Sequence, residues 1–223
     1  MKKRFVFLAA ALAAMLLTGC ALRTVEEMYA LPKRSEEFRE LQAAIDTAMY
    51  GMTYSSPQSG ENQQTVQTAD LNGDGLDEYL VFAKGATEKP LQVLIFQQDE
   101  TGKCRVLDTI GFNGQAFDQV EYMAFDDQPG LELVVGIQVS ERVLRNVAVY
   151  SFHGGSAELL LLNSYSKMLP CQLSGDKSEL MVLRPGEEET QRGMVVLYGY
   201  DKGQIVRSVE TELSEHTSRI RRI

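Results

Sequence analysis

The pattern of apolar positions changes after residue 51. Between residues 35 and 51, apolar side chains recur every three or four residues, which is the period of one face of an α-helix. These side chains are Phe38, Leu41, Ile45 and Met49. Ser35 can cap the amino end, and Gly51 can close the carboxyl end. The pattern therefore predicts an amphipathic helix over 35–51 that packs on the domain following it, with a partner-binding helix as the alternative.

The remainder of the chain consists of short apolar runs separated by polar turns, and no helical period follows residue 51. Val, Leu, Ile, Tyr and Phe dominate these runs, as they do in β-strands. Turn signals such as DETGK, FHGGS and YDKGQ lie between pairs of runs, as hairpins require. The runs are EYLVFAK, LQVLIFQ, RVLDTI, VEYMAF, LELVVGIQV, VAVYSF, ELLLLNSY, ELMVLRP, MVVLYGYD and IVRSVE. We therefore expect a mainly β fold built from hairpins.

Three segments repeat one order of features. Each has a polar, turn-rich loop, then a glutamate, then an apolar strand: ADLNGDGLDEYLVF, AFDDQPGLELVVG and QLSGDKSELMVL. The aligned glutamates are Glu78, Glu132 and Glu179, at spacings of 54 and 47 residues. A second apolar run ending in an aromatic residue follows each of them, and then a further turn and strand. Four strands in about 50 residues is typical of a propeller blade.

The amino end carries the features of a lipoprotein signal. Lys2, Lys3 and Arg4 precede an apolar run over residues 5–17, which is too short to span a membrane but suits a secretory signal peptide. The run ends in LTGC, which resembles a bacterial lipobox, and this resemblance implies that Cys20 is lipidated and becomes the mature amino terminus. We therefore expect a protein anchored by lipid to the extracytoplasmic face of the cell membrane. An ordinary signal peptide followed by an unrelated cysteine is the alternative.

The stretch DLNGDGLDEYLVF resembles the FG-GAP or VCBS-type repeat of integrin-like β-propellers. The order of lipobox, short tether, helix and repeat also resembles a group of secreted lipoproteins of Gram-positive bacteria. This resemblance implies a propeller-like repeat array and a calcium-type loop. Three blades cannot close a propeller, because known propellers have about four to eight. We expect a partial, about three-blade β-propeller-like array, with a β-sandwich or a fragment of a longer product as alternatives.

The loop supplies oxygen ligands at the alternate positions that a hard cation needs. Counted from the first aspartate, its ligands are Asp70, Asn72, Asp74, the carbonyl of Leu76, and Glu78. Gly75 allows a sharp turn at position 6. Val81 stands at position 12, where an EF-hand has a bidentate glutamate, so a true EF-hand is disfavoured. The loop predicts one calcium site with a structural role, whereas a plain turn without metal is the alternative.

The other two loops keep fewer of these ligands. The second has Asp126 and Asp127 but is one residue shorter and contains Pro129, and the third begins with Gln172. We expect both to be metal-free turns.

The expected organisation is a signal peptide over 1–19, a lipidated tether over 20–34 and the helix over 35–51. Three β repeats follow over 60–110, 117–165 and 166–214, and residues 215–223 form a frayed or truncated end. Processing after residue 19 removes three positive charges and takes the net charge from −9 to −12. Such a surface repels nucleic acid, so a protein or carbohydrate is the expected partner.

The sequence contains no motif of nucleophilic, metal-dependent or nucleotide-dependent catalysis. Its two histidines are His153, in a predicted hairpin turn, and His216. Cys104 and Cys171 could pair in an oxidising compartment, but their spacing does not indicate a bridge, and we expect two free thiols. We therefore expect a binding or scaffold module and not an enzyme. A glycoside-processing or other hydrolase, or a fragment without independent function, are the alternatives.

Overall fold

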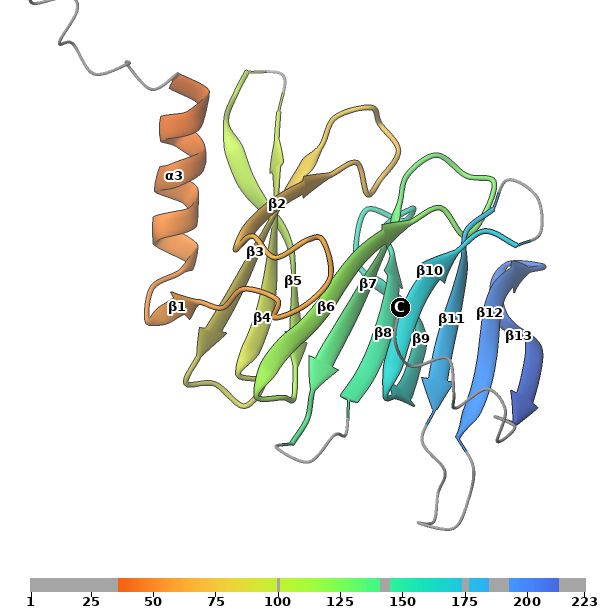
Figure 1. Ribbon diagram of the computed structural model, residues 1–223. Helices are drawn as coiled ribbons and strands as arrows, with labels where there is room; N and C mark the ends of the chain where they lie inside the picture. Colours follow the sequence, from red (N-terminus) through yellow and green to blue (C-terminus); the bar gives the residue numbers. More distant parts are fainter. Residues whose placement is uncertain (1–35, 100, 141–144, 174–176, 185–192, 213–223) are drawn as a thin grey trace, which may run out of the picture. The chain divides into compact units, whose positions relative to one another are not determined.

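The computed structural model describes residues 36–99, 101–140, 145–173, 177–184 and 193–212 (Figure 1). The described part is mainly β, as predicted, with one helix, α3 (Glu36–Ala48), followed by thirteen strands. The predicted signal peptide, Cys20, the tether and the end at 215–223 lie outside the described residues. Within the described residues, no helix is long and apolar enough to cross a membrane.

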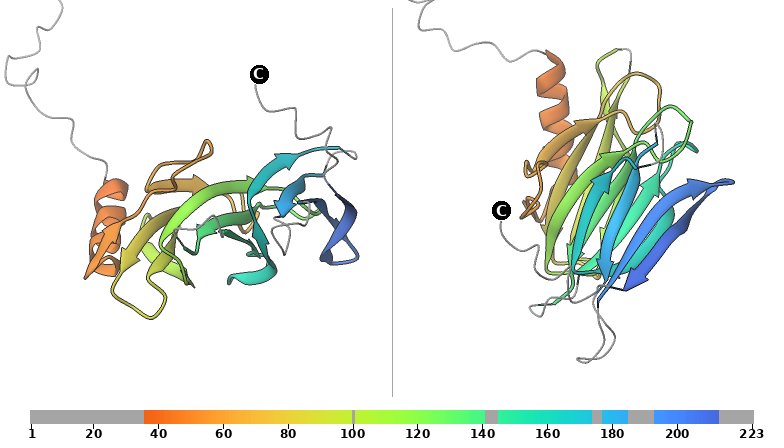
Figure 2. Two further views of the ribbon diagram at one scale, coloured as in Figure 1. Left: turned by 60° about the horizontal axis from the view of Figure 1, so that its bottom comes forward. Right: turned by 45° about the vertical axis from the view of Figure 1, so that its right-hand side comes forward.

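The strands form three antiparallel sheets, which Figures 1 and 2 show from three directions. In the first sheet, β1 and β2 pair along different parts of β3, and β4 and β5 follow in order. Its strands are β1 (Met52–Tyr54), β2 (Val66–Ala69), β3 (Glu78–Gly85), β4 (Leu91–Gln98) and β5 (Cys104–Phe112).

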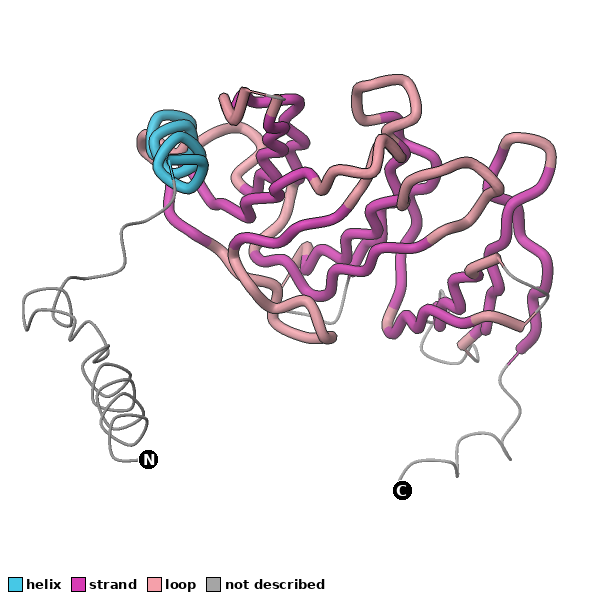
Figure 3. Tube along the Cα trace, turned by 90° about the horizontal axis from the view of Figure 1, so that it is seen from above, coloured by secondary structure: helices cyan, strands magenta, loops and turns pink. Residues whose placement is uncertain are grey.

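The second and third sheets each contain four strands in consecutive order. The second contains β6 (Ala116–Met123), β7 (Glu132–Gln138), β8 (Arg145–Ser151) and β9 (Glu158–Tyr165). The third contains β10 (Lys167–Cys171), β11 (Glu179–Arg184), β12 (Met194–Asp201) and β13 (Gln204–Glu212). Figure 3 shows these strands connected by turns and loops, with no further helix among the described residues. All ten strands expected from the sequence are present, whereas β1, β2 and β10 were not expected.

The pairing registers of the three sheets share one feature. Tyr79 pairs with Phe96 in the first sheet, Leu133 with Tyr150 in the second, and Leu180 with Tyr198 in the third. A bulge in the pairing to the last strand lies immediately before the second residue of each pair. Because bulges are conserved features within structural families, their recurrence at one position supports the internal repeat found in the sequence.

Helix α3 packs on the first sheet, as its amphipathic pattern predicts. Leu41, Ile45 and Met49 are buried against strand residues that include Val81 and Phe96. Phe38, which the periodicity places on the same face, is 43% exposed. The helix therefore covers apolar side chains of β3, β4 and β5 that would otherwise face solvent.

Apolar side chains also join neighbouring sheets. One cluster combines first-sheet residues such as Phe82 with second-sheet residues such as Phe117, whose rings meet edge to face with centroids 5.1 Å apart. A second cluster combines Val147 and Val149 of the second sheet with third-sheet residues such as Val182. The described sheets thus share buried cores with their sequence neighbours.

A polar network is buried inside the second sheet. The Tyr165 hydroxyl, at the end of β9, donates to Asp118 Oδ2 on β6, and Arg145 Nε on β8 lies 3.2 Å from the same oxygen. Burial, followed by the hydrogen bond to Asp118, raises the pKa of Tyr165. Gly136 lies on β7 beside the hydroxyl, and a Cβ atom there would overlap it. The glycine therefore leaves the space through which the tyrosine reaches Asp118.

Both cysteines in the described residues are free, as expected: Cys104 is buried, and Cys171 is half-buried.

Candidate metal loop and its counterparts

The predicted metal loop connects β2 to β3, and its side-chain oxygens accept hydrogen bonds from its own backbone. The two carboxylate oxygens of Asp70 accept from the N–H groups of Gly73 and Gly75 at 2.7 and 3.0 Å. The side chains of Asn72 and Asp74 accept from the N–H groups two residues ahead, both at 2.8 Å. Gly75 has φ +88°, a left-handed backbone conformation that residues other than glycine rarely adopt. The loop is therefore a tight turn, as predicted.

The structure brings three of the predicted ligands together at the side chain of Asn72. Its amide nitrogen donates to Glu78 Oε1 at 2.7 Å and to Asp74 Oδ2 at 3.1 Å. Gln97 of β4 also approaches Asp74 Oδ2, at 3.4 Å. In the described part of the chain, no ion pair joins these carboxylates to a lysine, arginine or histidine. The predicted metal ligands are carboxylates and a side-chain amide, and calcium prefers the oxygen atoms of such groups as ligands.

Glu78 is the buried member of this set, with an exposed fraction of 1%. Burial is the main cause of its raised pKa, and the nearby charges of Asp74 and Asp70 raise the pKa further. The hydrogen bond from the Leu71 N–H lowers the pKa and offsets part of this rise. The charged form of Glu78 is therefore disfavoured as the loop stands. A bound cation would offset this cost, because metal ligands bind in their deprotonated form.

The aligned glutamates all make the same contact, which the sequence alignment did not specify. Glu78 Oε2 accepts from the Leu71 N–H and Glu132 Oε2 from the Phe125 N–H, both at 2.9 Å. Glu179 Oε2 accepts from the Leu173 N–H at 3.0 Å. Each glutamate thus closes the loop before it by satisfying a backbone donor near the start of that loop.

The loops are also connected to one another in a regular way. The N–H group of Leu131, the residue before Glu132, donates to the Asp70 carbonyl at 3.0 Å. One repeat later, the N–H group of Ser178, before Glu179, donates to the Ala124 carbonyl at 2.8 Å. The first loop also touches the second closely, because a Cβ at Gly73 would overlap Pro129. The first loop therefore contacts the second directly, through the backbone at Asp70 and Gly73.

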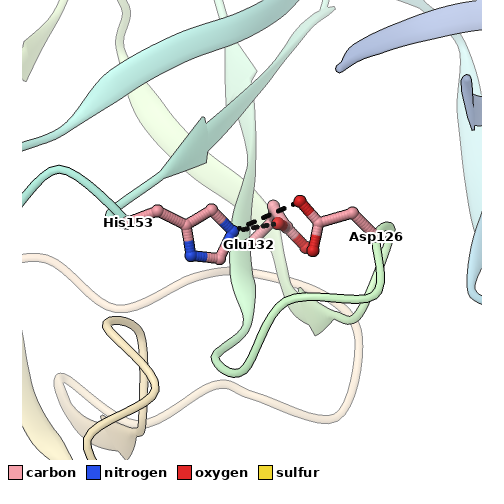
Figure 4. Close-up of side chains that lie close together, drawn as sticks. All are labelled: Asp126, Glu132 and His153. Atoms are coloured by element: carbon pink, nitrogen blue, oxygen red, sulfur yellow. Dashed lines mark ion pairs between the residues drawn. The ribbon is translucent and has the colours of Figure 1, made fainter. Parts of the chain in front are cut away.

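The second loop contains a cluster of side chains that the sequence did not reveal (Figure 4). His153, just after β8, places Nε2 at 3.3 Å from Asp126 Oδ2 and 3.4 Å from Glu132 Oε1. Burial is the main cause that raises the pKa of Glu132; the charge of Asp126 also raises it, and His153 lowers it. Asp126, Glu132 and His153 could together hold a metal ion. A repeat alignment could have located this histidine, because it lies 54 residues after Asp99, the spacing of the aligned glutamates.

A groove adjoins the first loop. A cavity of about 500 Å³ lies between residues 75–79, which end the loop and begin β3, and the end of β4 with the turn that follows it. Gln97, Gln98 and Asp99 line it from the side of that turn. Its walls therefore offer amide and carboxylate groups next to the predicted metal ligands.

Replacing Glu78 with glutamine is expected to remove a pH dependence of stability. In the absence of calcium, the raised pKa means that folded Glu78 keeps its proton at pH values where the unfolded chain has lost it. Stability therefore falls as pH rises from the ordinary glutamate pKa through the raised one, by about 1.4 kcal/mol for each pH unit that separates the two pKa values. Glutamine can still accept from the Leu71 N–H but does not titrate. Urea unfolding in EDTA between pH 4 and pH 7 measures the difference between the two proteins, and parallel pH profiles would refute the assignment.

No protein-family model matches the chain, and no curated protein matches it. Among solved structures, the chain is similar to a rhamnogalacturonan lyase, PL11, of Bacillus licheniformis, with a TM-score of 0.45 and 15% sequence identity. The match covers 72% of this chain and 35% of the lyase, so the chain spans about a third of the lyase's length. At this level of similarity, no conclusion about activity follows.

Proposed function

We propose that this protein is a lipid-anchored, extracytoplasmic binding or scaffold module made of propeller-type repeats, and that calcium stabilises its first loop. The observation that carries this proposal is the shared loop closure by Glu78, Glu132 and Glu179. Three equivalent loops are closed in one way, but only the first keeps a full set of oxygen ligands. The carboxylates of Asp74 and Asp70 lie near the buried Glu78, and a cation bound among them would offset the cost of its charge.

The propeller-type assignment is supported by the shared bulge position, by the four-stranded sheets in consecutive order and by the apolar clusters between neighbouring sheets. The regular hydrogen bonds between successive loops also support it, because stacked repeats contact their neighbours through equivalent groups. Helix α3 would then act as a cap on the first repeat, since it covers the β3 and β4 side chains that face away from the second sheet's cluster.

The structural role of calcium is supported by the position of the loop. Its backbone contacts Leu131 and Pro129 of the second loop. A cation that fixed Asp70, Asp74 and Glu78 would therefore also fix the contact between the first two repeats. The adjoining groove, with Gln97, Gln98 and Asp99 in its wall, would give a carbohydrate or peptide ligand hydrogen-bonding groups beside that cation.

The lipid anchor is proposed from the sequence, since Cys20 lies outside the described residues. Replacing Cys20 with serine is expected to move the protein from the membrane fraction to the soluble fraction, because serine lacks the thiol that carries the diacylglyceryl group. Fractionation and mass spectrometry of the mature amino terminus measure this change. Replacing Cys171 with serine serves as the control. A protein that stays in the membrane fraction after Cys20→Ser would contradict the anchor.

A further inference from the structure

We propose that Asp126, Glu132 and His153 form a second metal site, for a divalent transition metal such as Zn²⁺. The proposal is independent of calcium in the first loop. It departs from the expectation that the second loop is a metal-free turn, because that expectation considered only residues of the loop itself. His153 comes from the end of another strand, β8, and supplies a nitrogen ligand that the loop sequence does not contain.

The two carboxylates are already oriented to bind one metal ion. Asp126 Oδ1 accepts from the Gln128 N–H at 2.8 Å, and Oδ2 faces the histidine. Glu132 Oε2 accepts from the Phe125 N–H, and Oε1 faces the histidine. Each carboxylate therefore uses one oxygen for a backbone hydrogen bond and presents the other to the same place. Hydrogen bonds of this kind hold metal ligands in position.

The distances between the ligand atoms fit a small metal ion. Ligand atoms that bind Zn²⁺ tetrahedrally at about 2.0–2.1 Å are about 3.4 Å apart from one another. The observed separations from His153 Nε2 are 3.3 Å to Asp126 and 3.4 Å to Glu132. Nε2 itself is buried and makes no hydrogen bond within the described residues. A metal ion shared by all three atoms would replace the ion pairs that His153 makes with the two carboxylates.

The ligand types select a transition metal over calcium. An imidazole nitrogen suits zinc, copper, iron or nickel, whereas calcium takes oxygen ligands. Asp99 occupies the position equivalent to His153 in the first repeat, where it is exposed and binds the N–H and hydroxyl of Thr101. In the third repeat the register places Asp201 there, and it is also exposed. Among the described repeats, only the second therefore combines a histidine with the buried glutamate.

The site leaves room for a further ligand. The His153 side chain keeps 21% of its surface exposed, compared with 6% for Asp126 and 1% for Glu132. A water molecule could therefore complete the coordination from the exposed side. Tyr200 of the third sheet lies beside Asp126.

The test is a calorimetric titration of the full chain, purified in detergent, with Zn²⁺ in the presence of excess Ca²⁺. We expect one equivalent of Zn²⁺ to bind to the wild type. His153→Gln and Asp126→Asn should each weaken that binding by at least about 100-fold. Loss of a group that only hydrogen-bonds to a metal ligand already lowers metal affinity by about 10–100-fold. Asp74→Ala, in the first loop, should leave it unchanged. Co²⁺ in place of Zn²⁺ should give visible absorption bands that His153→Gln removes.

The two ligand variants keep the test decisive, since they change different elements and the asparagine variant preserves the shape of the Asp126 side chain. Circular dichroism establishes that each variant is folded. Absence of saturable Zn²⁺ binding to the wild type would overturn the proposal. Equal binding to the wild type and to both ligand variants would also overturn it. Neither result would bear on the proposed calcium site, which Asp74→Ala tests separately.

Discussion

Replacing Gly136 with alanine is expected to lower the free energy of unfolding by about 3 kcal/mol, the largest effect predicted for a single substitution here. The new methyl group would overlap the Tyr165 hydroxyl, and the tyrosine is 1% exposed and cannot move aside. Displacing it would break its hydrogen bond to Asp118, which also contacts Arg145. The midpoint of thermal unfolding should fall by about 6–12 °C.

A double substitution tests this cause. Tyr165→Phe alone should cost about 1.5–3 kcal/mol, because Asp118 loses a hydrogen bond to its charged carboxylate. Adding Gly136→Ala to Tyr165→Phe should cost much less than it does in the wild type, since the overlapping hydroxyl is then absent. Gly154, whose added Cβ would meet nothing within 4 Å, is the matched control. Additive effects of the two substitutions would contradict the steric explanation.

Calcium is expected to raise the midpoint of thermal unfolding by about 3–11 °C. With a dissociation constant of about 0.1–1 mM, typical of extracellular modules, about 10 mM Ca²⁺ contributes roughly 1.4–2.7 kcal/mol. A chain of this size shifts by about 2–4 °C per kcal/mol. The physical reason is that calcium stabilises the charged form of Glu78, whose pKa is raised mainly by burial and further by the charges of Asp74 and Asp70.

Asp74→Ala should abolish the calcium effect, because it removes a ligand that the structure brings to within hydrogen-bonding distance of the Asn72 side chain. Asp127→Ala is the matched control, since Asp127 is an exposed aspartate of the second loop that pairs with Lys177. The thermal shift between Ca²⁺ and EDTA should therefore persist in the control. An equal shift in both variants would assign the calcium effect to the general acidity of the surface.

The sequence predicted the strands that carry strong apolar patterns but not those that depend on their surroundings. Strands β3 and β4 are nearly continuous apolar runs. Strand β10 contains Pro170, which argues against a central strand but is tolerated here because β10 lies at the edge of its sheet. Strands β1 and β2 are only three and four residues long, and both form by pairing with β3. Such short segments are strands because they pair with a neighbouring strand, and their own sequence carries no pattern long enough to predict this.

In the candidate sites, too, features within one short segment were predictable, whereas contacts that depend on the surrounding fold were not. The spacing of Asp70, Asn72 and Asp74 identified the first loop, because all its side-chain ligands lie within nine residues. The contact of each aligned glutamate with a backbone N–H was not predicted, since it depends on how the loop folds back. His153 was missed for a physical reason: it lies 21 residues after Glu132 and reaches it only through the pairing of β7 with β8.

The most direct test of the proposed function is a crystal structure of the protein with calcium, using anomalous scattering to locate the ion. The proposal predicts one ion in the first loop, with oxygen ligands at about 2.3–2.6 Å. The ligands would be Asp70, Asn72, Asp74, the carbonyl of Leu76, and Glu78, and the Asn72 amide would have turned its oxygen toward the ion. An empty loop at saturating calcium, with the hydrogen bond from Asn72 to Glu78 intact, would contradict it.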